Sequence, residues 1–324
     1  NTFKAHKGDF TSMSIQGLIS TESFVTIVLI VVWYSSSVVC TNTTKQMGSL
    51  HWSVLTLAQM GTATCVSIVL CVLLRLFGPY MPIQNLDQLK LTTALSMCFL
   101  AGFVTLNSSL SEMHVSLAMT MRAMEPLFTL VLAAVCLKSE KFTVRILLSL
   151  LIVVFGAGLS AAESSECTAF GLGLLMLCNS CFAARGVITK ILKEKYGVDN
   201  YSLFLHICAI AAFFQAAVLA CYVGLGKVVI SDVLTEVQPS LLLLNGVTFW
   251  AYLQLSWVVL GRVSAVTHSV CNSLRRPVMC LFGWMQFGNH ISPLNAFGIA
   301  LASGGVVVYS QVKRMEAARA AKGK

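Results

Sequence analysis

Charged residues are scarce in this chain of 324 amino acids, where they make up 11% of the sequence against 56% hydrophobic residues. Soluble domains carry about a quarter charged residues, because their surfaces must interact with water. The apolar residues form many separate runs, each close to the roughly 20 residues that cross a bilayer as a helix. This composition excludes a soluble enzyme, a nucleic-acid-binding protein and a disordered scaffold. It predicts an all-α polytopic membrane protein.

Acidic clusters of the kind that a membrane-embedded transferase needs are also missing. The acidic residues between the apolar runs, such as Glu163, Glu166 and Asp199, are scattered and form no such cluster. We therefore expect a protein that is not an enzyme and that needs no cofactor.

A disulfide framework or metal centre is not indicated by the 12 cysteines. Nearly all of them lie in apolar runs, where cysteine behaves as a small hydrophobic residue. Cys178 and Cys181 form a C-x-x-C pair, but they lie in mid-helix without a second pair. We interpret them as packing residues and expect no metal.

Ten apolar segments have the length of a membrane span. They are residues 23–41, 53–74, 91–111, 114–137, 144–162, 167–189, 201–223, 239–261, 264–287 and 294–312. Tails at 1–22 and 313–324 flank them, and the start at Asn1 rather than methionine is consistent with a lost leader peptide. Pro126 and Pro277 fall inside the fourth and ninth spans, where each should bend or break its helix.

Basic residues are distributed very unevenly between the predicted loops. An even number of spans places both termini on one side, which then collects sixteen of the 22 lysines and arginines, against Lys45 and Lys227 opposite. By the positive-inside rule, both termini face the cytosol, or the stroma or matrix of an organelle. A seven-helix receptor does not fit this pattern. Topology also explains the net charge of +9, so we expect no nucleic-acid partner.

Weak internal repetition divides the spans into two halves. Residues 115–116 and 142–143 open the fourth and fifth spans, and similar pairs at 263–264 and 291–292 open the ninth and tenth. Five spans per half means that the second half crosses the membrane inverted. Inverted repeats are typical of transporters, with the substrate site at the repeat interface near the midplane. We predict repeats at 23–162 and 163–312.

Four arginines, Arg122, Arg185, Arg275 and Arg276, lie inside predicted spans. An arginine at mid-bilayer costs at least about 2.5–3.5 kcal/mol on insertion scales, so each needs a partner or water. Glu125 lies one turn after Arg122 and cannot neutralise all four. An anionic ligand would complete the balance, and guanidinium groups bind phosphate oxygens in a bidentate way.

This ligand interpretation is not equally strong for each arginine. It is favoured for the adjacent Arg275 and Arg276. A ligand and Glu125 are equally good partners for Arg122, and Arg185 is close enough to the end of its span to snorkel. Tyr252 could donate a hydrogen bond to a ligand or only pack, and His268 is either a ligand or proton site or a structural histidine.

The sequence around these residues resembles the plastid phosphate translocators, the triose-phosphate transporter family. Residues 115–128 resemble its segment V-S-F-T-H-x-x-K-A-x-E-P-x-F, and residues 252–276 resemble Y-x-Q…R-V…T-H-x-V-x-N-x-x-K-R. Residues 179–190 are similar to N-x-x-F-x-x-R-x-x-x-x-K, and Lys45 follows Trp33-Tyr34 at the family's distance. The likeness runs from about residue 25 to residue 312.

The resemblance implies the drug/metabolite transporter fold, ten helices in two inverted halves. It implies alternating-access exchange of a phosphorylated sugar or three-carbon acid for inorganic phosphate. Phosphate would be held at the positions of Arg122, Arg275 and Arg276, and the rest of the substrate by Tyr252. The wider candidate set adds Lys45 as a binding residue and, in support, Arg185, Lys190, His268 and Glu125.

Two positions depart from the triose-phosphate members, whose substrate-contacting His and Thr fall on Phe103 and Leu106 here. This more apolar wall disfavours a second charged or hydroxylated group, so triose phosphate and other phosphorylated substrates remain equally open. We expect small phosphorylated metabolites, phosphate and membrane lipid as partners, a monomer or loose dimer, and a plastid inner envelope location. The alternative is a nucleotide-sugar/nucleoside monophosphate exchanger of the same superfamily in the Golgi or ER membrane.

Overall fold

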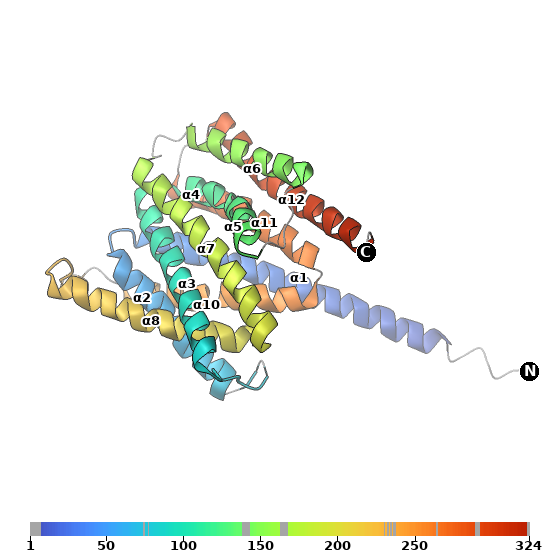
Figure 1. Ribbon diagram of the computed structural model, residues 1–324, viewed down its shortest axis with the longest axis horizontal. Coiled ribbons are helices and arrows are strands. Elements are labelled where there is room, and N and C mark those ends of the chain that lie inside the picture. Colours follow the sequence, from blue (N-terminus) through green and yellow to red (C-terminus); the bar gives the residue numbers. More distant parts are fainter. Residues whose placement is uncertain are drawn as a thin grey trace, which may run out of the picture.

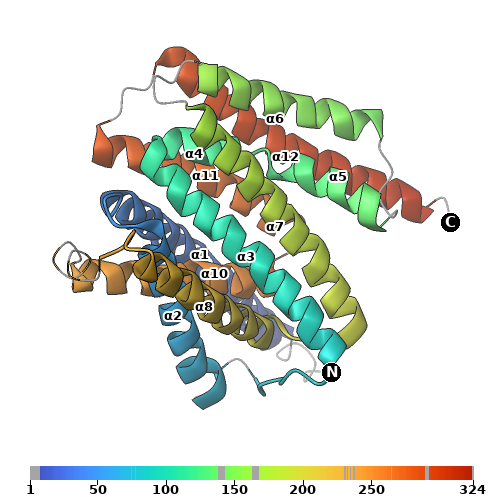
Figure 2. The same ribbon diagram turned by 60° about the vertical axis from the view of Figure 1, so that its left-hand side comes forward.

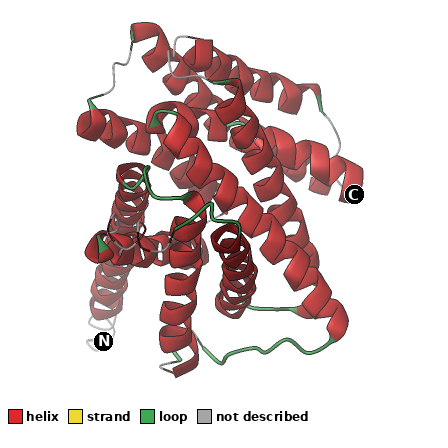
Figure 3. Cartoon of the chain, turned by 90° about the vertical axis from the view of Figure 1, so that its left-hand side faces the viewer, coloured by secondary structure: helices red, strands yellow, loops and turns green. Residues whose placement is uncertain are grey.

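The computed structural model describes residues 8–73, 75–76, 78–137, 143–162, 168–229, 238–263, 265–288 and 292–322, with the single positions 231, 233 and 235. Its helices are α1 (Gly8–Gln46), α2 (Trp52–Ser67), the π-helix η1 (Ile68–Leu73), α3 (Leu86–Glu112), α4 (Val115–Arg122), α5 (Glu125–Leu137), α6 (Val144–Ala162), α7 (Ala169–Tyr196), α8 (Asn200–Gly224), α10 (Pro239–Arg262), α11 (Ala265–Phe287) and α12 (Pro293–Lys322). Figures 1 and 3 show that helices make up most of the described chain.

Nine helical segments in the described part of the chain are long and apolar enough to cross a membrane. They coincide with nine of the ten predicted spans, which confirms an all-α polytopic membrane fold. The remaining predicted span, the ninth at 264–287, corresponds to α11, which is helical but carries the adjacent Arg275 and Arg276. The number of ten spans stays a prediction. Helix α1 begins at Gly8 and α12 runs to Lys322, so both helices extend into the segments predicted as tails.

Short polar side chains fix the starts of several helices by accepting hydrogen bonds from free backbone N–H groups. Asn85 accepts from Gln88 N at 2.8 Å at the start of α3, and Thr168 accepts from Gly171 N at 3.0 Å at the start of α7. Helix α7 ends at Gly197, whose φ of 60° is the left-handed conformation that glycine adopts without strain.

The fourth predicted span is broken between α4 and α5. The backbone N–H of Ala123 bonds Thr120 O at 2.9 Å and that of Met124 bonds Met121 O at 3.2 Å, which is the tighter i→i+3 pattern. Pro126 is the second residue of α5, where its missing N–H is tolerated. Pro277, by contrast, lies inside α11, which continues unbroken through it. The break places Glu125 beside Arg122.

The helices pack mainly in six pairs: α6 with α12, α3 with α7, α1 with α10, α2 with α8, α2 with α10, and α4 with α11. Figure 2 shows α6 and α12 side by side at one edge and α2 and α8 at another, with α3 and α7 running between them. Glycines allow the closest approach. A Cβ added to Gly298 would lie 2.7 Å from Ser160 N, so α6 and α12 meet backbone to backbone.

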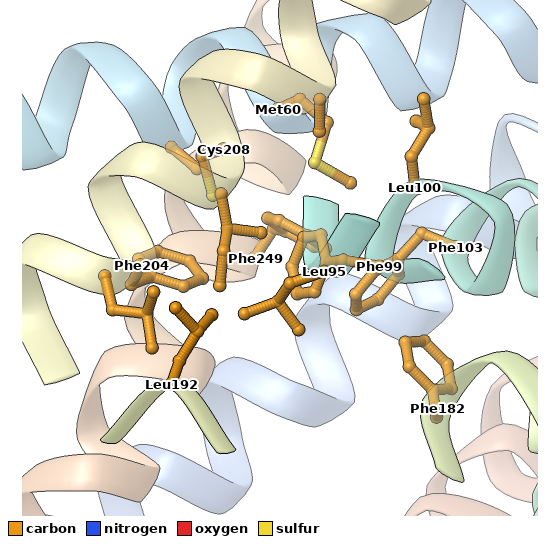
Figure 4. Packing of buried hydrophobic residues seen from close by; sticks show 14 of the residues in the cluster. Met60, Leu95, Phe99, Leu100, Phe103, Phe182, Leu192, Phe204, Cys208 and Phe249 are labelled. Atoms are coloured by element: carbon orange, nitrogen blue, oxygen red, sulfur yellow. The ribbon is translucent and has the colours of Figure 1, made fainter. Parts of the chain in front are cut away.

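Aromatic side chains form the centre of the largest core cluster (Figure 4). Phe103 lies 4.8 Å from both Phe99 and Phe249 and 5.0 Å from Phe182, measured between ring centroids. These rings come from α3, α7 and α10. Large apolar side chains elsewhere are highly exposed, including Phe155 at 65% and Phe213 at 72%, as expected for helices that face lipid.

A buried polar network joins α1, α2, α3 and α10 beside this cluster. Asn245 donates to Cys40 O at 2.9 Å, Gln59 donates to Asn245 Oδ1 at 2.9 Å, and Asn107 donates to Gln59 Oε1 at 2.9 Å. Polar groups away from water need such partners, so the network specifies how these helices meet. Of the aromatic cluster beside it, Phe99, Phe103 and Phe182 line a cavity between the helices.

Candidate functional site

A cavity of about 550 Å³ lies between the helix groups. All four arginines predicted inside spans line it, and they come from α4, α7 and α11. The cavity extends to the C-terminal end of α7 at Lys190 and Lys193 and to the first residue of α8, Asn200. The structure therefore brings together basic side chains that are up to 154 positions apart in the sequence, Arg122 and Arg276.

Glu125 forms ion pairs with two of the arginines at once. Its Oε2 accepts a hydrogen bond from Arg122 Nη2 at 2.9 Å and another from Arg276 Nη2 at 3.1 Å. The three side chains are only 13%, 22% and 11% exposed, in the order Arg122, Glu125, Arg276. Glu125 is thus a partner of Arg122, as one of the two sequence interpretations held, and it also joins α5 to α11.

Arg275 is held mainly by neutral groups. Its Nη1 donates to Ser37 Oγ at 3.0 Å, and its guanidinium carbon lies 5.5 Å from the Trp33 ring and 5.4 Å from the Tyr252 ring. Trp33 stacks on His268 with ring centroids 5.2 Å apart. Cation–π contacts of this kind stabilise a desolvated arginine without neutralising its charge.

Arg185 faces aromatic rings. Its guanidinium carbon lies 4.8 Å from the Phe182 ring and 5.8 Å from the Phe99 ring, and Arg122 approaches the same Phe182 ring at 4.4 Å. Across the described residues, no carboxylate forms a salt bridge with Arg185 or Arg275. Four arginines and one nearby glutamate therefore leave this end of the cavity strongly positive.

Tyr252, His268, Phe103 and Leu106 also line the cavity, which places the predicted apolar wall next to the arginines. His268 Nε2 lies 3.1 Å from Ser256 Oγ, a partner suited to a structural histidine. Gln254, two residues after Tyr252, is 1% exposed and is not part of the lining.

Lys45 and Lys190 occupy different places from the arginines. Lys190 lines the cavity and lies 3.9 Å from Glu194, in a pair whose side chains are 54% and 66% exposed. Lys45 is not among the lining residues. Its ammonium donates to the Met113 carbonyl at 3.0 Å, at the C-terminal end of α3, where Met113 is fully buried. Met113 belongs to a packed cluster that also contains Met119 and Met279, two residues that line the cavity.

Some contacts at the site had no clear signal in the sequence, although Asn179 opens the motif matched at residues 179–190. Asn179 accepts from Arg122 Nη1 at 3.1 Å, and its own amide donates to Met121 O at 3.0 Å. Ser37 contacts Arg275, and Lys193 lies over the Trp257 ring at 4.6 Å. For Ser37, the only indication in the sequence was its position one helical turn after Trp33. Cys178 bonds Gly102 O, and the described residues contain no group of three or more potential metal ligands.

Comparison with known proteins identifies the family of the chain. Residues 24–310 match the model of the Triose-phosphate Transporter family. The chain is 33% identical over 237 residues to phosphoenolpyruvate/phosphate translocator 1, chloroplastic, from Oryza sativa subsp. japonica, covering 71% of this chain and 57% of that protein. It is 32% identical over 240 residues to the triose phosphate/phosphate translocator, non-green plastid, chloroplastic, from Brassica oleracea var. botrytis, covering 71% and 58%.

The chain thus spans less than two thirds of the length of these relatives. One solved crystal structure of a protein superposes on this chain with a TM-score of 0.56, covering 91% of this chain and 99% of that one. At 14% identity, this likeness concerns the fold alone. From the family match over residues 24–310, the chain belongs to the triose-phosphate transporter family.

Proposed function

We propose that this protein is a membrane antiporter that exchanges a phosphorylated metabolite for inorganic phosphate. The observation that carries the proposal is the convergence of Arg122, Arg275 and Arg276 in one cavity. Arg276 Nη1 and Arg275 Nε are buried, and neither has a hydrogen-bond partner among the described residues. Buried, unpaired N–H groups of a cation are costly, and phosphate oxygens would complete them. The names of the relatives support the same activity.

Alternating access would move the two halves around this site. If each of the first five spans corresponds to one of the last five, then α2 packs on its counterpart α8, α4 on α11 and α6 on α12. In the same scheme α7 is the counterpart of α1 and α10 is the counterpart of α3. The contact of α1 with α10 is therefore equivalent to the contact of α7 with α3. This pattern supports inverted repeats at 23–162 and 163–312. An empty cavity in which Arg185 and Arg275 have no carboxylate partner among the described residues resists closing, which favours obligatory exchange over one-way flux.

The preferred metabolite would be phosphoenolpyruvate rather than a hydroxylated sugar phosphate. Phe103 and Leu106 offer no hydrogen-bond partner to a hydroxyl group, whereas Arg185 beside them can pair with a carboxylate. Phosphoenolpyruvate has a planar, unsaturated carbon skeleton without hydroxyl groups that suits Phe103 and Leu106. Its carboxylate can pair with Arg185. Two of the relatives, from Oryza sativa and Arabidopsis thaliana, are named as phosphoenolpyruvate/phosphate translocators.

The location would be the inner envelope membrane of a plastid, with both termini in the stroma. The relatives are named as chloroplastic proteins, and the uneven distribution of basic residues supports this orientation. Protease protection of a C-terminal epitope in intact plastids tests the orientation directly.

The exchange is tested by uptake of radiolabelled phosphate into liposomes that contain the purified protein. The liposomes are preloaded in turn with phosphate, phosphoenolpyruvate, triose phosphate, hexose phosphate, UMP or buffer alone. Arg275→Ala and Arg276→Ala should reduce uptake by at least about 100-fold, because each removes a charge that phosphate needs. Arg319→Ala is the matched control, since Arg319 pairs with Glu316 outside the cavity and is 59% exposed.

Each loading condition distinguishes one interpretation. Uptake with phosphoenolpyruvate or phosphate inside, but not with buffer, supports the exchanger. Uptake that requires UMP inside favours the nucleotide-sugar alternative. Absence of phosphate uptake under every load contradicts a phosphate exchanger.

A further inference from the structure

The carboxylate of Glu125 occupies the guanidinium groups that the proposed function assigns to phosphate. A single oxygen, Oε2, lies 2.9 Å from Arg122 Nη2 and 3.1 Å from Arg276 Nη2. No other carboxylate in the described part of the chain pairs with either arginine. The cavity therefore already contains one anion, supplied by the protein, between two cations from different halves of the chain.

Glu125 has room to leave these partners. It is the most exposed of the three side chains, at 22%, and it begins α5 after the break, so its position is not fixed by α4. A second cavity of about 200 Å³ lies behind it and is lined by Glu125, Asn272 and Arg276 together with residues of α5 and α12. A carboxylate that moves away from Arg122 thus has an empty space with polar walls next to it.

Phosphate and the carboxylate compete for the same N–H groups. Two anions cannot share one pair of guanidinium groups without strong repulsion at a separation of a few ångströms. A phosphate dianion carries more charge and more acceptor oxygens than a carboxylate, so its contacts with the two arginines are stronger. When phosphate departs, the carboxylate can return and cover the same groups.

We infer that Glu125 acts as an internal anion that takes the place of phosphate at Arg122 and Arg276 in the empty carrier. This inference rests on the proposed function. Glu125 is then a positioning residue and does not bind the substrate. It weakens phosphate binding by competition and speeds phosphate release by replacing it.

Glu316 provides a matched control for removing such a carboxylate. Its Oε1 also bridges two arginines, Arg145 at 3.1 Å and Arg319 at 3.3 Å, and its side chain is also 22% exposed. This second bridge lies on α6 and α12, outside the cavity. A variant of Glu316 therefore shows the effect of losing a bridging carboxylate outside the cavity. Any further effect in a variant of Glu125 comes from its place at the binding site.

The test is the affinity of the purified full chain for inorganic phosphate, measured by isothermal titration calorimetry. Glu125→Gln should lower the Kd for phosphate roughly tenfold, the order expected when one charge-assisted competitor is removed. Glu125→Asp carries a shorter carboxylate that bridges the arginines less well, so its Kd should fall by a smaller factor. Glu316→Gln should leave the Kd unchanged.

Exchange measured in liposomes adds a second readout. Glu125→Gln should lower both KM and kcat for phosphate, because tighter binding without a replacing anion slows release. A purely structural role would lower the amount of active protein and leave KM unchanged. Gel filtration establishes the folded fraction of each variant, and Glu125→Asp carries the comparison if Glu125→Gln does not fold.

The outcomes separate this inference from the proposed function. A folded variant of Glu125 whose Kd equals or exceeds that of the unaltered protein overturns the inference and leaves the exchanger standing. If neither the unaltered protein nor the variants bind phosphate, both are overturned. If Glu125→Gln alone binds it, the internal anion is supported and the exchanger is contradicted.

Discussion

Arg122 is held from several directions, whereas Arg275 makes one hydrogen bond, to Ser37, within the described part of the chain and rests on two rings. Arg122 donates to Asn179, Cys178 and Glu125, and it also covers the Phe182 ring. An arginine fixed on all sides supplies a charge at a defined place, because its planar guanidinium loses little freedom for each bond it forms. Arg275, with its Nε unpaired, is free to adjust to a substrate.

Asn179→Ala should therefore impair exchange through Arg122. It leaves Arg122 Nη1 without its amide partner and Met121 O without a donor, at a side chain that is fully buried. We expect a loss of about 1–3 kcal/mol in stability and roughly tenfold lower exchange per folded molecule. Thermal unfolding in detergent and liposome exchange measure the two effects.

Asn295→Ala is the control for this prediction. Asn295 is 8% exposed and makes the same kind of bond, to Ser160 O at 3.1 Å, but it lies between α6 and α12. It should lower stability and leave exchange per folded molecule unchanged. Equal losses of exchange in both variants would argue against a specific role of Asn179.

Among the helices, α6 and α12 form the tightest pair, and the break between α4 and α5 is the most consequential irregularity. The pair depends on Gly156 and Gly298, where an added Cβ would collide with the backbone of the other helix. In a membrane, apolar side chains are no better solvated by each other than by lipid, so there is no hydrophobic driving force between helices. Close approach of the two backbones supplies the packing energy instead. The break separates Arg122 from α5 and lets Glu125 reach α11.

Gly156→Val should separate α6 from α12. Its Cβ would lie 2.8 Å from Gly298 O and would also meet the Ala302 backbone, neither of which can rotate away. We expect a loss of about 2–4 kcal/mol, seen as a lower thermal unfolding temperature. Gly158→Val on the same helix meets nothing within 4 Å and should change the temperature little.

At the level of the whole molecule, the sequence allowed the spans to be predicted because hydropathy and loop charge are local properties. The convergence of Arg122, Arg185, Arg275 and Arg276 was also predictable. A buried charge needs a partner or water, and one anionic ligand in one cavity can serve several arginines. The specific partners were not, because Cys178 and Asn179 reach Arg122 from a helix distant in the sequence. Pro126 and Pro277 looked equivalent in the sequence, yet only Pro126 lies in the first turn of a helix, next to a break.

The cavity extends to the end of α7, on the side where both termini are predicted. Thr189→Cys, which lines the cavity, should therefore react with a membrane-impermeant maleimide added from the side of the C-terminal tail. Phosphate at saturating concentration should slow this reaction several-fold, because an occupied cavity closes more readily. Protein with the native Thr189 gives the background, and labelling from the opposite side alone would contradict the orientation.

Lys45 adds a positive charge to the packed cluster around Met113, which borders the cavity through Met119 and Met279. The ammonium satisfies the Met113 carbonyl at the negative end of the α3 dipole. If the proposed exchange opens the cavity through this cluster, the bond must break and the ammonium must turn toward water. The same charge would then attract anions to the opening, so capture from the far compartment would weaken as the ionic strength rises.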